Sequence, residues 1–492
     1  MSGDGATLAE IAASLDDVSS VTGPRTVVSS VTHDSRKVTP GSLFVAISGA
    51  TSDGHRFIDS AIEAGAVAVL SERSIDADVG CIVVPDTRAA MAWAANVVYG
   101  RPDEDLTIVG ITGTNGKTTV SHMCESIWRS AGRKVGVIGT LGARIDGEPV
   151  PIERTTPESS DLQELLATMR NVGVEVVAME VSSHAMALHR ADAVTFEVVA
   201  FTNLSQDHLD FHGDMAAYFA AKAALFESGR ARRGIINIDD AYGCRLVELA
   251  GVPLVTVGAS AEADFRFLDV VGTPEGTRFV VEYDDRRLAL AIPVMGSFNV
   301  ANAAIAAAIA LSLDTPTAAI VSGLASLPVV DGRMEVIEHG GPFTVIVDYA
   351  HSPGAISEVL QAARSVAERN VIAVIGAAGD RDRDKRALMG AAAVRFADLV
   401  IITSDNPRSE DPAMIAREVQ RGADTAPEAN AVTVIDRRAA ITAALDAAEA
   451  EDIVLILGKG HEQGIERHGV IEPFDDRATA RAVLDALGWG AP

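Results

Sequence analysis

A glycine-rich turn follows directly after a short apolar run, and this junction limits the folds that the chain can adopt. Residues 111–119 read Ile-Thr-Gly-Thr-Asn-Gly-Lys-Thr-Thr and follow the run Leu106–Val109. A strand leading into such a turn and then a helix is typical of a phosphate site, because glycines let backbone N–H groups surround anionic oxygens. Lys117 adds positive charge, and the Thr118 hydroxyl can bind Mg²⁺. We therefore expect an α/β enzyme whose ATP-binding turn comprises Gly113, Thr114, Asn115, Gly116, Lys117, Thr118 and Thr119.

Length and composition suit such an enzyme. The 492 residues are 48% hydrophobic but only 4% aromatic, which predicts about three domains with aliphatic cores. The net charge of −27 disfavours nucleic acid and anionic membranes as partners. Cys81, Cys124 and Cys244 have no paired spacing, and no signal peptide precedes them, so we expect a cytoplasmic protein. The Ala-rich stretch Asn302–Leu313 is too short for a membrane span and predicts a buried helix. We also expect a monomer.

Apolar runs divide the chain into three predicted α/β units, 1–103, 104–331 and 332–492. The stretch Arg101–Asp105 is expected to be a linker. In the central and third units, short apolar runs alternate with helical segments, which predicts parallel, doubly wound sheets. The runs expected to form strands are Ser42–Ile47, Val67–Leu70, Leu106–Gly110, Val135–Ile138, Val174–Val181, Val198–Thr202, Ile235–Asn237, Phe343–Asp348, Val371–Ile375, Leu399–Thr403 and Ile453–Leu457, with Phe265–Val270, Arg278–Tyr283 and Leu288–Ile292 antiparallel.

Three polar residues of the central unit lie where chemistry is expected. Glu180 ends a predicted strand near the turn, so its carboxylate could complete a Mg²⁺ site begun by Thr118. His208 lies in a dense polar segment, and a neutral imidazole can bind metal. Lys222 lies in an apolar helical stretch, where a buried ammonium needs a partner, an exit to solvent or a modification.

Many further motifs make the chain similar to the Mur ligase family. The phosphate turn itself has the form Gly-Thr-Asn-Gly-Lys-Thr, which the family shares with folylpolyglutamate synthases. The resemblance covers nearly the whole chain and is carried by residues 34–36, 40–46, 53–55, 113–119, 155–157, 180–184, 203–212, Lys222, Asn299, Asn302, 332–335, 348–351, 379–382, 405–408 and 458–462. Departures are confined to the C-terminal unit, where the turn 376–379 lacks a cysteine and a glycine, Ala387 replaces a proline and Thr479 replaces a glutamate.

The resemblance implies three domains and an ATP-dependent ligase. The N-terminal α/β unit would bind a UDP-sugar, the central P-loop ATPase-like sheet would bind ATP, and the C-terminal Rossmann-like sheet would bind an amino acid. The reaction would add a third residue to UDP-N-acetylmuramoyl-L-alanyl-D-glutamate through an acyl phosphate, in peptidoglycan synthesis.

The same resemblance implies roles for individual residues. Catalysis would use Lys117, Glu180, His208 and Lys222. Lys222 would be carbamylated (N6-carboxylysine) and bind Mg²⁺ with Thr118, Glu180 and His208. Further ATP contacts would be Asn299, Arg333 and Asp348. The UDP-sugar dipeptide would contact Ser35, Thr155, Thr156, Ser182 and Arg190. The incoming amino acid would contact Arg386, Asp405, Asn406, Arg408, Gly458 and Glu462.

Arg408 bears on the identity of the amino acid. Its sequence context Asp-Asn-Pro-Arg accompanies meso-diaminopimelate in the family, and an arginine fork suits a distal carboxylate. Glu462 could receive the distal ammonium. L-Lysine and L-ornithine stay open as the added residue, with Arg408 then making only a structural ion pair.

Two further functions compete with this interpretation. The first is a folylpolyglutamate synthase-like ligase, which shares the phosphate turn but is disfavoured by the N-terminal unit. The second is a catalytically dead nucleotide-binding scaffold, which is disfavoured by the presence of Lys117, Glu180, His208 and Lys222.

Overall fold

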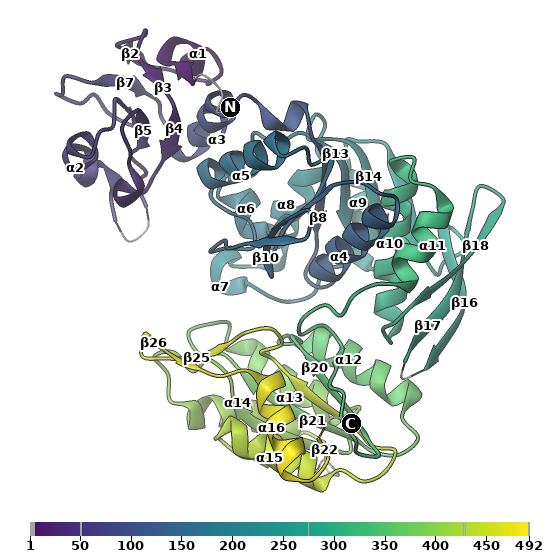
Figure 1. Cartoon of the computed structure of the whole chain (residues 1–492). Coiled ribbons are helices and arrows are strands. Elements are labelled where there is room, and N and C mark those ends of the chain that lie inside the picture. Colours follow the sequence, from purple (N-terminus) through teal and green to yellow (C-terminus); the bar gives the residue numbers. More distant parts are fainter. Residues whose placement is uncertain (1–4, 50–51, 274, 427, 429, 491–492) are drawn as a thin grey trace.

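The computed structural model describes residues 5–49, 52–273, 275–426, 428 and 430–490, which fold into three lobes in chain order (Figure 1). Each lobe is built on its own main sheet. The expected α/β class with parallel sheets in three domains is confirmed. Within the described part of the chain, none of the helices combines the length and apolar character that a membrane span requires.

The N-terminal lobe has a five-stranded sheet of order β2-β7-β6-β5-β4, in which only β2 runs antiparallel to its neighbour. Helices α1 and α3 pack on one face and α2 on the other. A two-stranded β1–β3 sheet lies beside it. The elements are β1 (Ala6–Thr7), α1 (Leu8–Ala13), β2 (Ser20–Thr22), β3 (Val27–Val28), β4 (Ser30–Thr32), β5 (Ser42–Val45), α2 (Ile58–Glu63), β6 (Ala68–Ser71), β7 (Gly80–Val83) and α3 (Thr87–Val98).

The expected linker Arg101–Asp105 is an ordered connection that contacts both lobes. Pro102–Glu104 forms a 3₁₀ turn, η3, and Pro102 is buried. The Asp103 carboxylate accepts hydrogen bonds from Asn96 Nδ2 at 2.6 Å and from the Thr195 backbone N–H at 3.2 Å. These bonds tie the first lobe to the second.

The central lobe has an eleven-stranded sheet of order β11-β10-β9-β12-β8-β13-β14-β15-β16-β17-β18. The seven strands from β9 to β16 are parallel, and both ends are antiparallel. The elements are β8 (Thr107–Thr112), α4 (Lys117–Ser130), β9 (Val135–Gly139), β10 (Gly142–Ile145), β11 (Glu148–Val150), α5 (Ser159–Asn171), β12 (Val176–Glu180), α6 (Ser183–Ala187), β13 (Phe196–Phe201), α7 (Leu209–His212), α8 (Met215–Ala223), β14 (Ala231–Asn237), α9 (Ala241–Leu249), β15 (Leu254–Gly258), β16 (Phe265–Thr273), β17 (Gly276–Tyr283), β18 (Arg286–Ile292), α10 (Ser297–Ser312) and α11 (Thr317–Ala325).

Two layers of helices cover this sheet, as expected for crossover connections. Along β8, Ile108 faces the core formed with α5, α6, α8 and α9, while Val109 and Ile111 face the core formed with α4, α10 and α11. The Ala-rich α10 is fully buried over Ala303–Ala310, as the sequence predicted. Small side chains let such a helix pack closely on α4 and the sheet.

The C-terminal lobe has a six-stranded sheet of order β19-β20-β24-β21-β22-β23, parallel except at β19. Helices α12, α13 and α14 cover one face, and α15 and α16 cover the other. The elements are β19 (Glu335–Val336), β20 (Thr344–Asp348), α12 (Pro353–Val366), β21 (Val371–Ala377), α13 (Asp384–Val394), β22 (Leu399–Ser404), α14 (Pro412–Ala423), β23 (Ala431–Thr433), α15 (Arg437–Ala447), β24 (Ile453–Leu457), the hairpin strands β25 (Gly464–Arg467) and β26 (Val470–Pro473), and α16 (Asp476–Ala486).

Candidate active site

The turn between β8 and α4 requires glycine at two positions. Gly113 and Gly116 have φ values of 144° and 86°, which side-chain-bearing residues rarely adopt. A Cβ at Gly113 would also collide with the Thr202 hydroxyl, and one at Gly116 with the Asn302 amide. The turn is therefore a tightly packed backbone structure that opens onto the N-terminus of α4.

The end of β13 supports this turn. The Asn203 carbonyl accepts from the Thr114 backbone N–H at 2.8 Å, and the Asn203 side chain accepts from the Asn115 backbone N–H at 3.0 Å. The Thr202 hydroxyl donates to the Asn115 carbonyl at 2.6 Å. Neighbouring parallel strands thus fix the shape of the phosphate turn.

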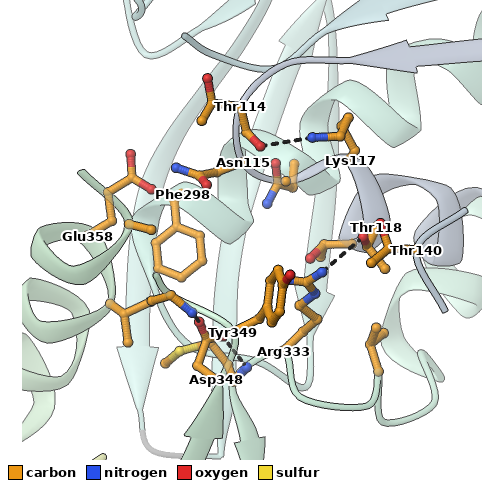
Figure 2. A pocket seen from close by; sticks show the side chains of 18 of the residues that line it. Thr114, Asn115, Lys117, Thr118, Thr140, Phe298, Arg333, Asp348, Tyr349 and Glu358 are labelled. Atoms are coloured by element: carbon orange, nitrogen blue, oxygen red, sulfur yellow. Dashed lines mark hydrogen bonds between the residues drawn. The ribbon is translucent and has the colours of Figure 1, made fainter. Parts of the chain in front are cut away.

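Three cations, Lys117, Lys222 and Arg333 (the central cations), surround the turn. Lys117 Nζ donates to the Gly113 and Thr114 carbonyls, both at 2.9 Å, and Lys222 Nζ donates to the Gly113 carbonyl at 2.7 Å. Arg333 donates to the Thr118 hydroxyl at 3.2 Å and stacks on the Tyr349 ring (Figure 2). Among the described residues, no carboxylate oxygen lies within 4.0 Å of any central cation. The site therefore offers positive charge to an anionic ligand.

Burial governs the protonation of both lysines. It lowers the pKa of Lys117, against an opposing effect of Glu180. It lowers the pKa of Lys222 well below the usual value, and the nearby charge of Lys117 lowers it further. Lys222 is 1% exposed. The buried Lys222 amine therefore holds its proton less firmly than an exposed lysine does.

Glu180 and His208 flank the turn as expected. Both Glu180 oxygens accept hydrogen bonds from Thr140, from its backbone N–H at 2.9 Å and its hydroxyl at 3.0 Å. Burial lowers the pKa of His208 to about 3, so its imidazole is neutral near pH 7, the form that binds metal. His208 has a left-handed backbone, with φ of 55°, at the start of α7.

The donor set fits Mg²⁺ once an anion is added. Thr118 and Glu180 supply oxygen ligands of the kind that Mg²⁺ prefers. Among the described residues, no three His, Cys, Asp or Glu side chains come together closely enough to hold a metal. A carbamate on Lys222 or a phosphate of the nucleotide would supply the missing oxygens, and the unpaired central cations show that the site is built for added negative charge.

A cavity of about 220 Å³ opens between the central and C-terminal lobes. It is lined by the phosphate turn and by all three further ATP residues expected from the sequence, Asn299, Arg333 and Asp348. The Asp348 carboxylate accepts from the backbone N–H groups of Met334 at 2.7 Å and Ala350 at 2.8 Å. The two domains therefore contribute one wall each.

The lining residues to which sequence reasoning gave no role include Phe298, Tyr349 and Glu358 (Figure 2). Phe298 and Tyr349 adjoin Asn299 and Asp348, so their positions beside recognised motifs were the available signal. Glu358 lies on α12 and carried no signal. Burial and the nearby Asp240 and Asp348 raise its pKa to about 7.

Four of the five residues expected to bind the UDP-sugar dipeptide lie together at the end of β12. Thr156 Oγ1 donates to the Glu180 carbonyl at 2.9 Å and accepts from the Ser182 backbone N–H at 3.2 Å. Arg190 donates to the Thr156 carbonyl at 3.3 Å, and Thr155 contacts Thr140 at 3.2 Å. Ser35 lies apart, in a 3₁₀ turn of the N-terminal lobe.

The residues expected to bind the amino acid form two groups. Asp405, Asn406 and Glu462 surround the fully buried Lys459 Nζ at 3.3, 3.1 and 3.0 Å, and Gly458 adjoins it with a φ of 113°. Although burial opposes ionisation of Asp405, Lys459 and Arg437 hold its pKa below the usual value.

The two arginines of this pocket form the second group. Arg386 is 1% exposed and pairs with Glu410 at 2.8 Å and Glu418 at 2.7 Å. Arg408 pairs with Glu466 of β25 at 3.0 Å and donates to the Gly379 carbonyl at 2.7 Å. Both arginines thus have carboxylate partners in the protein. Sequence analysis assigned no role to Lys459, Glu410 or Glu466.

Three family profiles match this chain in the order of its lobes. They are described as Mur ligase family, catalytic domain (residues 27–103), Mur ligase middle domain (111–310) and Mur ligase, glutamate ligase domain (332–460). The chain is 48% identical, over 93% of its length and 92% of the relative, to the UDP-N-acetylmuramoyl-L-alanyl-D-glutamate–2,6-diaminopimelate ligase of Streptomyces coelicolor. It belongs to the Mur ligase family.

Solved structures agree with this membership. A UDP-N-acetylmuramoyl-L-alanyl-D-glutamate–2,6-diaminopimelate ligase matches this Mur ligase with a TM-score of 0.71 and 33% identity, over 98% of this chain and 99% of that one. A Mycobacterium tuberculosis folylpolyglutamate synthase, solved with ADP and AMPPCP, matches with a TM-score of 0.62 and 19% identity, over 75% of this chain and 92% of that one. That second likeness concerns the fold alone. The chain thus belongs to a family of ATP-dependent ligases, and the enzyme class expected from the sequence is confirmed.

Proposed function

We propose that this Mur ligase joins meso-diaminopimelate to UDP-N-acetylmuramoyl-L-alanyl-D-glutamate, with ATP hydrolysed to ADP and phosphate, in peptidoglycan synthesis. The observation that carries the proposal is the 48% identity to a ligase of that name over nearly the full length. The pocket chemistry supports it, because Arg408 and Glu466 lie side by side and together match a distal group that carries both a carboxylate and an ammonium.

We assign the three substrates to three domains. Residues 1–103 would bind the UDP-sugar, residues 104–331 would bind ATP, and residues 332–492 would bind the amino acid. The protein would act as a cytoplasmic monomer on these small molecules, and its three cysteines, which are all free, suit a reducing compartment.

The chain's own residues account for activation of the D-glutamate carboxylate. The backbone of Gly113–Thr118 would hold the ATP phosphates, and Lys117 would turn from the Gly113 and Thr114 carbonyls to neutralise charge on the transferring phosphoryl group. Glu180, His208, Thr118 and the carbamate of Lys222 would hold Mg²⁺, which would supply further charge neutralisation on the phosphates. Thr155, Thr156, Ser182 and Arg190 would orient the acceptor carboxylate.

Amide formation would follow from alignment by the C-terminal domain. The amine of the incoming residue would attack the acyl phosphate, and the tetrahedral adduct would expel inorganic phosphate. Positioning of this kind supplies a large part of a rate enhancement. Enclosure between the lobes would also keep water from hydrolysing the acyl phosphate.

The proposal is tested by phosphate release from ATP in the presence of the UDP-sugar dipeptide or a folate, with each of meso-diaminopimelate, L-lysine, L-ornithine and L-glutamate. We expect release to require the dipeptide and meso-diaminopimelate together. Preference for lysine or ornithine would change the third residue but leave the ligase assignment. Release that requires a folate and glutamate would replace the proposed function.

A further inference from the structure

One carboxylate at the boundary between the central and C-terminal lobes contacts both of them. Asp207 lies between β13 and α7, directly before His208, and is 5% exposed. Its Oδ1 atom accepts from the His208 backbone N–H at 3.0 Å and from Lys385 Nζ at 3.1 Å. Its Oδ2 atom lies 3.5 Å from His351 Nε2.

The two partners from the C-terminal lobe come from different elements. Lys385 lies in the first turn of α13 and is itself 5% exposed, and His351 lies in the loop after β20. Among the described residues, Asp207 is the one carboxylate within 4.0 Å of Lys385. Gln206 adds a second contact across the boundary, donating to Asp382 at 3.0 Å. The segment 206–207 is therefore a docking point for the C-terminal lobe.

Lys385 and Arg386 are neighbours that form ion pairs in different lobes. Lys385 extends to the central lobe, while Arg386 pairs with Glu410 and Glu418 inside its own lobe. The start of α13 thus connects the amino-acid pocket to the loop that carries His208. Removing one partner of a buried ion pair leaves the other charge uncompensated, so the two lobes are coupled through this contact.

We propose that Asp207 is a positioning residue, which holds the His208 loop in the metal-binding arrangement only while Lys385 of the docked C-terminal domain neutralises it. This inference rests on the proposed function, in which His208 binds Mg²⁺. It means that docking of the amino-acid domain completes the metal site, so that phosphoryl transfer is restricted to the assembled enzyme. Groups that hold a metal ligand in place typically change metal affinity or activity by about 10–100-fold when removed.

Lys385→Met gives the sharpest test, because Lys385 belongs to another domain and is not a metal ligand. We expect it to raise the Mg²⁺ concentration for half-maximal phosphate release about tenfold. Lys385→Arg should keep the wild-type requirement. The control Lys134→Met should keep it too, since it removes an exposed lysine of the central lobe whose Nζ donates to the Val172 carbonyl at 3.3 Å. An unchanged Mg²⁺ requirement in Lys385→Met would overturn the proposal and reduce the pair to an interface contact.

Two further measurements separate this proposal from the proposed function. Asp207→Asn combined with Lys385→Met should be no worse than the more impaired single variant, because the two residues act as a unit; additive losses would contradict the coupling.

Thermal unfolding with ADP and increasing MgCl₂ reads metal binding without turnover. We expect the Tm of Lys385→Met to rise less with MgCl₂ than the Tm of the wild type. An identical rise would refute the positioning role. A wild-type enzyme that responds to Mg²⁺ but releases no phosphate would refute the proposed function instead.

Discussion

The proposed phosphate site and the proposed amino-acid pocket differ in whether their cations have carboxylate partners. The central cations have no carboxylate within 4.0 Å among the described residues, and both lysines of the set donate to backbone carbonyls. In the C-terminal pocket, Arg386, Arg408 and Lys459 each pair with at least one carboxylate. An unpaired cluster attracts polyanions such as nucleotide phosphates, whereas a field of ion pairs suits a ligand that carries both signs of charge.

The difference also separates the energetic roles of the two regions. Buried, unpaired lysines destabilise the ligand-free protein and become favourable when an anion such as phosphate binds. Paired arginines are already stabilised by carboxylates of the protein. The charged groups of an incoming zwitterion must therefore replace these carboxylates as partners of the arginines. We therefore expect substitutions in the first region to reduce turnover most strongly, and substitutions in the second to alter selectivity.

The largest effect is expected for Lys222→Ala. Loss of the proposed carbamate should reduce ligation by roughly 10²–10³-fold or more. Added short carboxylic acids should restore part of the rate by replacing the missing anion. The control Lys134→Ala should neither lose activity nor gain rate from the added acids. Steady-state phosphate release measures both. Full activity of Lys222→Ala would show that the reaction needs no carbamate at this position.

Lys117→Ala should come next. In the proposed function the lysine binds phosphate and supports no core, so ATP turnover should fall by about 10²–10³-fold while the unfolding transition is retained. Nucleotide titration followed by calorimetry, together with circular dichroism, distinguishes a lost site from a lost fold. Wild-type ATP turnover would show that the unpaired charge of Lys117 is not directed at phosphate.

Arg408→Ala probes the paired region. Losing a charge-assisted contact to the distal carboxylate should cost about 2–5 kcal/mol, expressed mainly in the KM for meso-diaminopimelate. The KM values for ATP and the UDP-sugar dipeptide should barely change, and L-lysine should become a relatively better substrate. Glu466→Gln is the matched variant, since it releases Arg408 without removing it. Equal loss with every amino acid would make Arg408 structural.

Glu358→Gln should have the smallest effect, and it tests a carboxyl group of the nucleotide cavity that has a raised pKa. Because the folded-state pKa of about 7 lies above the usual value of 4.5, the contribution of Glu358 to stability is full below pH 4.5 and is lost as the pH rises through 7. The variant should therefore be more stable than wild type at pH 8, by about 1–2 kcal/mol after allowance for solvent screening, with the gap closing toward pH 4.5. Urea unfolding at several pH values measures this. A gap that does not depend on pH would contradict the raised pKa.

Sequence reasoning recovered the parallel sheets because buried strands such as β8, β21 and β24 are short apolar runs bounded by turns. It did not find β10 and β11, which are short, partly exposed and lie at the antiparallel edge of the sheet beyond β9. It also treated β16 as purely antiparallel, whereas β16 pairs in parallel with β15 through Phe265 and Arg266. Such edge pairings depend on tertiary contacts more than on local pattern.

In the candidate site, a residue could be predicted when its partners lie close to it in the sequence. Residues 113–119 are consecutive in the turn and the first residues of α4, so a motif identifies them together. The partners of Asp207, Arg386 and Arg408 lie 24 to 178 residues away and meet only when the strands and lobes assemble. Charge pairing of this kind leaves no local pattern, which is why Lys385, Glu410 and Glu466 escaped sequence analysis.

The central claim is that the phosphate site activates the substrate carboxylate as an acyl phosphate before the C-terminal pocket delivers the amine. Transfer of ¹⁸O tests it most directly. UDP-N-acetylmuramoyl-L-alanyl-D-glutamate labelled with ¹⁸O in the reacting carboxylate is turned over with ATP and meso-diaminopimelate, and the released phosphate is analysed by mass spectrometry. We predict one labelled oxygen in each phosphate released. Phosphate without label, formed alongside the ligated product, would contradict the claim.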